Sequence, residues 1–491
     1  MKKWLLNNGF VLIVALLNLL LALYATPIID HADAAVYIDF SQVLLGAETD
    51  VNYAHRSPLY SIILAGFSLF FDSPVLFKAV VFFQYGLLAV TTVLLCRLFN
   101  RILQGRWLPA IGALLFNLSL ASVYFANIMM TEILTVFLLV VSTELIFRAY
   151  EGGKVQTYFW LGGIVGLLVL ARFNTVPLLL TYLVIIGLLL YLQNQPLRRW
   201  AGSLAAFILP LGLLLNGWCL YNLQHNDFYG LFPRVGQGVP RNITVASINE
   251  DDKVSEEHQA ILDIFLEARQ VYYENMPPER KGSLASFDRY NILADLYGGY
   301  MIYRYALPGL RAHFELGPSE GEYELSQGLR EFYQEIAEQN SGFIMKYRIV
   351  SFFSSFRASV AGVLPDRYGN INLNVLPAFV FVLYKLGFLL MSAVTFLAFF
   401  VFLGRAARDR KLPDFYQLVL FFIVFSFWGI NLVFVTGADA NRYKFPADPF
   451  VIALFLVYAT SVISWLRSGR PPRRQAPKLK TQKQHYSKSP A

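Results

Sequence analysis

The sequence predicts an all-α polytopic membrane protein of about ten transmembrane helices. We expect an interfacial helix in its first outer loop and a small helical extracytoplasmic domain. The 491 residues are 56% hydrophobic and only 15% charged, which is rare for soluble domains. Apolar runs recur along the chain, and about 20 helical residues cross a bilayer core. Lys and Arg gather in alternate loops, as the positive-inside rule requires.

Each predicted span is an apolar run bounded by charged or helix-breaking residues. No small-x-small cleavage site ends the apolar core of the first run, so we expect it to be retained as a span that also acts as the targeting signal. The predicted spans are 8–26, 75–99, 107–126, 131–149, 157–174, 176–193, 200–220, 375–403, 414–436 and 446–466. An even number of spans returns the chain to the side on which it began.

The distribution of basic residues orients these spans. The tail from Arg467 to the end carries eight Lys or Arg and no acid. We therefore expect both termini to be cytoplasmic, in the plasma (inner) membrane, with the tail on anionic lipid and no nucleic-acid partner. The candidate inner loops hold Arg97, Arg101 and Arg106, then Arg148 and Lys154, then Arg198 and Arg199, then Arg405, Arg408, Arg410 and Lys411.

Two outer segments have helical character. The stretch 57–71 is apolar but short for a span, which predicts an interfacial helix. The segment 222–374 is too long for a structureless loop, and it repeats apolar residues at intervals of three and four over 256–276, 286–306 and 328–362. The predicted organisation is a seven-span module (1–225), a helical insertion (226–370), a three-span region (371–466) and a basic tail (467–491).

The first outer loop carries acids where the chain leaves the first span. Asp30 and Asp33 are three residues apart and Tyr37 follows four later, so a helix would place them on one face. A carboxylate at this boundary can act as a general base on a hydroxyl. The alternative is that these are solvated loop acids.

Further charged residues lie at the outer ends of other spans. Arg56 precedes the interfacial helix and could bind a phosphate, or simply meet lipid headgroups. Glu132 begins the fourth span, where it either lines the same face as Asp33 or favours a helix N-terminus. Arg172 closes the fifth span, and an arginine within a membrane is usually functional or paired.

The last outer loop, 436–446, contains Arg442 and Lys444 beside lipid. The positive-inside rule disfavours bases there, so this pair suits an anionic amphiphile, a phosphate on a long apolar tail. Structural pairing with Asp439 or Asp448 is the alternative.

Other chemistries have little support in the sequence. The six His are scattered and no HExxH or Cys/His cluster occurs, so the sequence supports neither a metal site nor a cofactor and leaves metal dependence open. Glycine-rich phosphate loops are also missing, which argues against a cytoplasmic nucleotide site.

Together these elements resemble the GT-C glycosyltransferases of family 39. This is the dolichyl-phosphate-mannose protein mannosyltransferase type, which includes bacterial lipid A aminoarabinose transferases. The resemblance covers residues 1 to about 225, the catalytic module of that fold, and 436–450. The matching elements are Asp33 to Tyr37, Arg56 to Tyr60, Thr131-Glu132, Arg172, and Arg442 to Pro446. The family's Asp-Glu pair reads Asp33-Ala34 here, so Asp30 supplies the second acid or none is needed.

The resemblance implies an inverting transfer of a sugar from a polyprenyl-phosphate donor to a hydroxyl of a lipid, glycan or protein acceptor on the extracytoplasmic face. Asp33 would be the base, with Asp30 and Glu132 as further catalytic acids. The donor phosphate would be bound by Arg56, Arg172, Arg442 and Lys444. Supporting roles would fall to Tyr37, His55, Tyr60 and Tyr443.

Two other functions stay open at this point. A transporter or flippase of a lipid-linked or anionic substrate would also be polytopic, but charges near mid-membrane and repeat symmetry would then be expected. A polysaccharide ligase or polymerase would use the same kind of donor and transfer a larger glycan.

Overall fold

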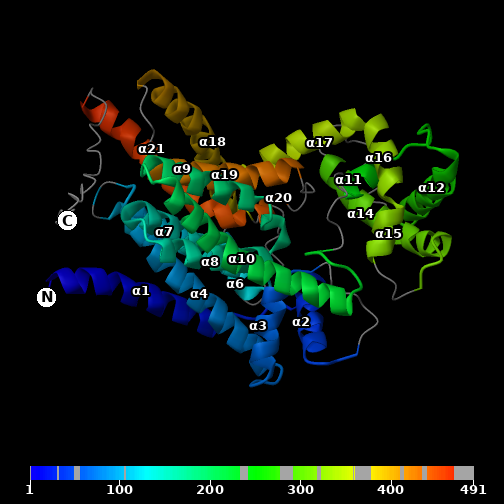
Figure 1. The fold of residues 1–491 in the computed structure, drawn as a ribbon, viewed down its shortest axis with the longest axis horizontal. Helices are drawn as coiled ribbons and strands as arrows, with labels where there is room; N and C mark the ends of the chain where they lie inside the picture. The colour runs from blue at the N-terminus through cyan, green and yellow to red at the C-terminus, as the bar shows by residue number, and fades with distance from the viewer. Residues whose placement is uncertain are drawn as a thin grey trace, which may run out of the picture.

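The protein is an all-α, multi-pass membrane protein. The computed structural model describes residues 2–29, 32–48, 53, 56–103, 105, 107–232, 241–276, 291–317, 322–357, 359, 378–409, 414–433 and 440–468. Within this part all the secondary-structure elements are helices, and the only β pairing is an isolated bridge. The elongated helical bundle has the first residues of α1 and the last residues of α21 at the same end (Figure 1).

Among the described residues, seven helices are long and apolar enough to cross a membrane, and each coincides with a predicted span. They are α4 (Val75–Phe99), α7 (Glu132–Gly152), α9 (Leu178–Leu192, extended by the 3₁₀ turn η1, Phe173–Thr175), α10 (Leu197–His225), α18 (Ala378–Asp409), α19 (Phe415–Val433) and α21 (Asp448–Ser468, preceded by η5, Phe445–Ala447). Their alternation of buried and exposed apolar residues fits a bundle with a lipid-facing surface.

The remaining predicted spans have a different form. The predicted span 107–126 is a pair of helices, α5 (Leu108–Asn117) and α6 (Leu120–Asn127), bent by 46°. The bend falls where Ser119 caps α6 by accepting a hydrogen bond from the Ser122 amide at 3.1 Å. Predicted spans 8–26 and 157–174 correspond to the apolar part of α1 (Lys2–Tyr24) and to α8 (Val155–Ala171), which are shorter apolar helices. The count of ten therefore stays a prediction.

Helix α8 packs closely against α10 because glycines line the contact. A Cβ atom on Gly162 would lie 1.9 Å from the Phe207 carbonyl oxygen, and one on Gly166 would lie 2.9 Å from Leu214. Small residues four apart allow two membrane helices to approach in this way. The contact matters for the site, since α8 ends at the residue before Arg172.

The insertion is helical and has a hydrophobic core of its own. Its helices are α11 (Arg241–Ser247), η2 (Glu256–His258), α12 (Gln259–Glu274), α14 (Asn291–His313), α15 (Glu322–Gly328), α16 (Arg330–Gln339) and α17 (Ser341–Ser354). Phe265 stacks on Phe332 with ring centroids 5.6 Å apart. The pattern 328–362 predicts one long helix, but Asn340 interrupts it by capping α16 and donating to Asp252.

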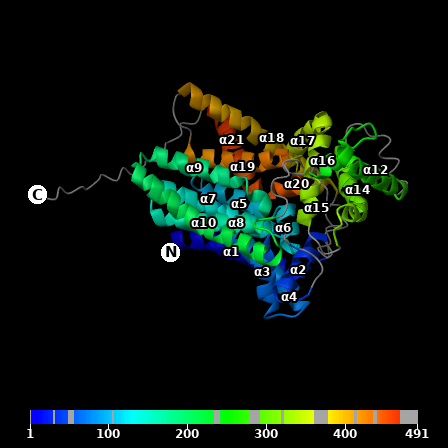
Figure 2. The same cartoon turned by 45° about the vertical axis from the view of Figure 1, so that its right-hand side comes forward.

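Figures 1 and 2 show α11 to α16 at the end of the bundle opposite to the start of α1, with α17 leading back to it. Helix α17 packs against α19 and against the short helix α20 (Ala440–Tyr443). The segment that follows α1 supplies α2 (Ala32–Leu44) and α3 (Pro58–Ser68), which pack on each other at this same end. Helix α3 lies where the interfacial helix is predicted.

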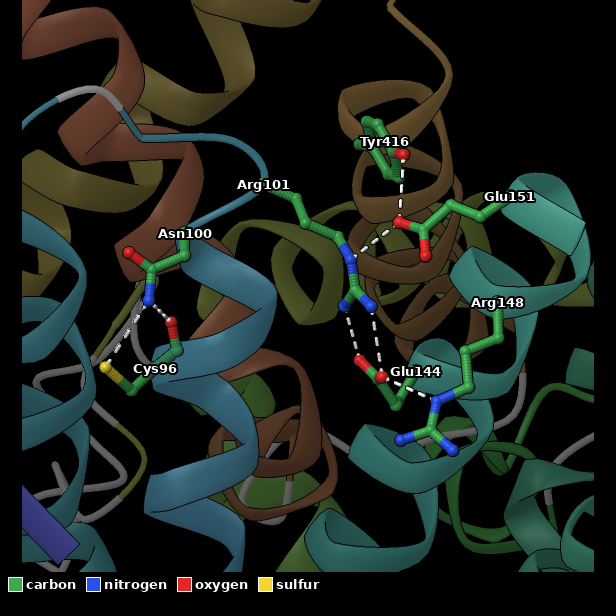
Figure 3. A network of polar contacts seen from close by, with 7 residues as sticks. All are labelled: Cys96, Asn100, Arg101, Glu144, Arg148, Glu151 and Tyr416. Atoms are coloured by element: carbon green, nitrogen blue, oxygen red, sulfur yellow. Dashed lines mark hydrogen bonds and ion pairs between the residues drawn. The ribbon is translucent and has the colours of Figure 1, made fainter. Parts of the chain in front are cut away.

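An ion-pair network joins the N-terminal module to the C-terminal region at the other end of α7 (Figure 3). Arg101 donates to both oxygens of Glu144, at 2.5 and 3.1 Å, and to Glu151 at 2.8 Å. Arg148 also donates to Glu144, and the Tyr416 hydroxyl of α19 donates to Glu151 at 3.1 Å. Separating these groups would leave the buried Glu144 carboxylate unpaired, which is costly, so this network links α4, α7 and α19.

Candidate functional site

Asp33 is paired with two arginines that come from distant parts of the chain. It lies in the first turn of α2, where a carboxylate interacts favourably with the helix N-terminus. Its Oδ1 is 3.0 Å from Nη1 of Arg56, and its Oδ2 is 2.6 Å from Nη1 of Arg442. The side chain keeps 23% of its surface exposed, so a substrate hydroxyl can reach it.

Glu132 is the second carboxylate of the site and is completely buried. It begins α7, and its Oε1 accepts from Nε of Arg442 at 2.5 Å. Nη1 of Arg172 is 3.4 Å from the same oxygen. A buried carboxylate must be paired to remain charged, and here two guanidinium groups provide that pairing.

Arg172 is held rigidly at the break between α8 and α9. Its extended backbone (φ −159°, ψ 106°) ends α8, and its carbonyl accepts from the Thr175 side chain at 2.7 Å. The residue is 5% exposed, and its guanidinium lies over the Tyr443 ring, 4.7 Å from the centroid. The Arg172 side chain therefore points into the protein rather than toward lipid. There its guanidinium makes a cation–π contact with the face of the Tyr443 ring.

Among the described residues, several buried polar atoms of this site lack a hydrogen-bond partner. They are Nε of Arg56, Oε2 of Glu132, and both terminal nitrogens of Arg172. The 3.4 Å approach of Arg172 to Glu132 is thus an ion pair without hydrogen-bond geometry. Leaving a buried donor without an acceptor costs about 1–3 kcal/mol. Each such group needs an explanation, and a ligand that supplies the missing partners would be one.

A single β-bridge brings the two carboxylates together. Ile28 pairs in parallel with Ile128, with the Ile28 amide donating to the Asn127 carbonyl at 2.8 Å. Ile28 precedes Asp33 by five residues and Ile128 precedes Glu132 by four. The pairing therefore sets the two segments that carry the acids in fixed register.

Gln84 of α4 forms hydrogen bonds to this bridge, and it was not predicted from the sequence as a site residue. Its amide nitrogen donates to the carbonyls of Ala126 and Ile128 at 3.1 and 2.9 Å, and its amide oxygen accepts from the Tyr60 hydroxyl at 3.3 Å. The sequence does contain a signal, because a polar amide within an apolar span is costly unless it has partners. However, the carbonyls to which it donates belong to residues some 40 positions further along the sequence.

The predicted supporting tyrosines form the floor of the site. Tyr37 and Tyr60 meet edge to face with ring centroids 5.5 Å apart, and Ser61 donates to the Tyr37 carbonyl. Burial raises the pKa of the Tyr37 phenol, against the opposing effect of Arg56. Tyr37 therefore stays protonated and neutral, and it contributes packing and a hydroxyl rather than charge.

Lys444 is fully buried, and it pairs with Asp448 rather than with Asp33 or Glu132 among the residues that the structure describes. Nζ lies 2.7 Å from Oδ1 of Asp448, and the Ser359 hydroxyl donates to Oδ2 at 2.5 Å. Nζ also lies 3.7 Å from the centroid of the Phe388 ring. This is the i,i+4 pairing that the sequence offers as the alternative to phosphate binding.

Two predicted site residues, Asp30 and His55, lie outside the described residues. No group of three His, Cys, Asp or Glu side chains that could hold a metal ion occurs in the described part of the chain. Chemically, the described cluster offers three guanidinium groups, two carboxylates and a protonated phenol. Such a set can bind an anion with several oxygens and can accept a proton.

Comparison of the chain with protein-family models finds no match, and no curated protein matches it either. The resemblance to GT-C glycosyltransferases therefore rests on the five sequence elements.

Proposed function

We propose that this protein is a membrane glycosyltransferase that moves a sugar from a polyprenyl-phosphate donor to an acceptor hydroxyl on the extracytoplasmic face. The observation that carries the proposal is the convergence of Asp33, Glu132, Arg56, Arg172 and Arg442 at one end of the bundle. These residues come from segments up to 409 positions apart. Together with Lys444, they are the charged residues of the elements that resemble family 39.

The proposed reaction is a single displacement. Asp33 takes the proton of the acceptor hydroxyl, the hydroxyl oxygen bonds to the anomeric carbon, and the bond from that carbon to the phosphate oxygen breaks. The bonding pair leaves with the polyprenyl phosphate, so the anomeric configuration inverts. The guanidinium groups of Arg56, Arg172 and Arg442 stabilise the charge that develops on the leaving phosphate.

Charge balance supports this assignment. Three guanidinium groups against two carboxylates give the described cluster a net charge of +1, which balances the single negative charge of a phosphodiester donor. After transfer Asp33 is protonated and the cluster reaches +2, which balances a phosphomonoester dianion. The site thus stays close to neutral throughout the reaction, as a partly buried site requires.

The test is mass spectrometry of envelope lipids, glycans and glycoproteins from cells that contain the protein, lack it, or carry Asp33→Asn. We expect one sugar to disappear from a defined acceptor in the last two strains. Asp39→Asn is the matched control, because Asp39 lies on the same helix and is exposed, and it should leave the glycan intact. Unchanged glycans without the protein would refute the proposal. Accumulation of an intact lipid-linked substrate on the cytoplasmic face would favour a flippase.

A further inference from the structure

The two carboxylates of the site form ion pairs with the arginines that would bind a phosphate. Both oxygens of Asp33 are engaged, Oδ1 by Arg56 and Oδ2 by Arg442. Arg442 is shared in turn with Glu132 through its Nε. A carboxylate that accepts from two guanidinium groups is strongly stabilised in its charged form. It is therefore a poor acceptor for the proton of a hydroxyl while those pairs last.

Two of the arginines, Arg56 and Arg172, carry nitrogens that lack an acceptor. Nε of Arg56 and both terminal nitrogens of Arg172 are buried without a hydrogen bond, among the residues that the structure describes. Five N–H donors per guanidinium cannot all be satisfied by two carboxylates. A phosphate adds oxygens with several lone pairs at the point where this shortage exists.

We propose that donor binding exchanges the Arg442–Asp33 ion pair for an Arg442–phosphate pair, and that this exchange releases Asp33 to act as the base. The inference rests on the proposed function and adds a mode of control to it. The enzyme's own carboxylates keep the arginines in place while the site is empty, and the base becomes competent only when the donor phosphate has taken its partner. Asp33 then turns to the acceptor hydroxyl.

The exchange predicts that removing the charge of Asp33 strengthens phosphate binding. The full chain is purified in nanodiscs, and binding of a long-chain polyprenyl monophosphate is followed by intrinsic tryptophan fluorescence. We expect Asp33→Asn to bind on the order of tenfold more tightly than the unmodified protein, a change equivalent to about 1.4 kcal/mol. Glu132→Gln is a second variant with the same expected direction, in case Asp33→Asn does not fold.

Glu144→Gln is the matched control. Glu144 lies on the same helix as Glu132, is 5% exposed and is paired with two arginines, Arg101 and Arg148, but at the other end of α7. Its substitution should leave the affinity for polyprenyl phosphate unchanged. Inorganic phosphate and phosphatidylglycerol are titrated in parallel, which separates recognition of the polyprenyl phosphate from binding of any phosphate or headgroup.

A double-mutant cycle with Arg442→Gln distinguishes exchange from simple repulsion between Asp33 and the ligand. If Asp33 competes for Arg442, the gain from Asp33→Asn shrinks when Arg442 is absent. A gain of the same size in both backgrounds, or no gain in the unmodified background, would overturn the exchange while leaving the donor class standing. Failure of the unmodified protein to bind polyprenyl monophosphate at all would instead refute the proposed function.

Discussion

Ile28 and Ile128 form a parallel β-bridge that connects the end of the first span to the start of α7. The bridge is one pair long, yet it aligns the two segments that lead into Asp33 and Glu132. An isolated bridge of this kind has little stability by itself. Gln84 donates to the Ile128 carbonyl of the bridge and to the neighbouring Ala126 carbonyl, and so we expect the geometry of the acids to depend on a side chain of α4.

We expect Gln84→Met to impair catalysis more than stability. Methionine keeps the length of the side chain but cannot donate to the carbonyls of Ala126 and Ile128, so the bridge loosens while the packing persists. A misplacement of about 1 Å can cost about 10²-fold in rate. The turnover of sugar transfer should fall with the Michaelis constant for the donor nearly unchanged.

Thr92→Val is the control for this substitution. Thr92 lies on the same helix, is buried, and accepts from Asn117 at 2.7 Å, but it is far along α4 from the bridge. It should lower the melting temperature without changing turnover per folded molecule. Equal turnover in Gln84→Met and in the unmodified protein would show that Gln84 serves packing alone.

Asp33→Asn should abolish transfer, because an amide cannot accept the acceptor's proton. Loss of a general base costs about 10²–10⁴-fold in rate. Turnover is measured with purified protein and a polyprenyl-phosphate sugar, and the protein level is checked by immunoblot. Full turnover in this variant would remove Asp33 from the mechanism, and loss confined to Asp30→Asn would move the base three residues upstream.

Much of the architecture follows from composition, because a membrane span is specified by a continuous apolar run. The predicted boundaries of α4 and α7 fall within a few residues of the observed ones. The bend between α5 and α6 could not be predicted from composition, because the apolar pattern continues through Ser119 and only the capping geometry ends the helix.

The site could be predicted in part for a related reason. Charged residues beside lipid are costly, so Glu132, Arg172 and Arg442 stand out in the sequence, and the fold brings them together. Gln84 did not stand out, because its role depends on backbone carbonyls that only the folded chain supplies. The pairing of Lys444 could be foreseen only as one of two alternatives, since the side to which a lysine turns is decided by packing.

Gly162→Ala should destabilise the protein. The added methyl group would overlap the Phe207 carbonyl, so α8 and α10 must separate, at a cost of about 1–3 kcal/mol. Gly163→Ala is the control, because its Cβ would meet Pro210 at an ordinary 3.9 Å. Thermal unfolding followed by tryptophan fluorescence should show a lower midpoint for the first variant only. Equal midpoints would mean that the two helices are not closely packed in the membrane.

The proposed orientation is tested by cysteine labelling in intact cells. Cys96 and Cys219 are both replaced by alanine, and single cysteines are then introduced at Lys253 in the insertion and at Gln156 in the first turn of α8, which are exposed positions. A membrane-impermeant maleimide should label the first without treatment and the second only after permeabilisation. The reverse pattern would invert the topology and would place the candidate site on the cytoplasmic face.

Arg442 and Lys444 are predicted to differ in function although they are two residues apart. Arg442 contacts both Asp33 and Glu132, whereas Lys444 is buried against Asp448. Arg442→Ala should weaken donor binding or turnover by about one to two decades, the equivalent of a charged hydrogen bond. Arg442→Lys should recover only part, because a point charge replaces a two-pronged donor.

Lys444→Ala should act on stability instead, since it leaves the Asp448 carboxylate buried and unpaired. Breaking a buried ion pair in this way costs about 3–5 kcal/mol, whereas replacing both partners by apolar residues is often close to neutral. The double variant Lys444→Met with Asp448→Leu should therefore recover the melting temperature and retain affinity for polyprenyl phosphate. Loss of that affinity in a stable double variant would show that Lys444 binds the phosphate after all, and that its pairing with Asp448 is a resting arrangement.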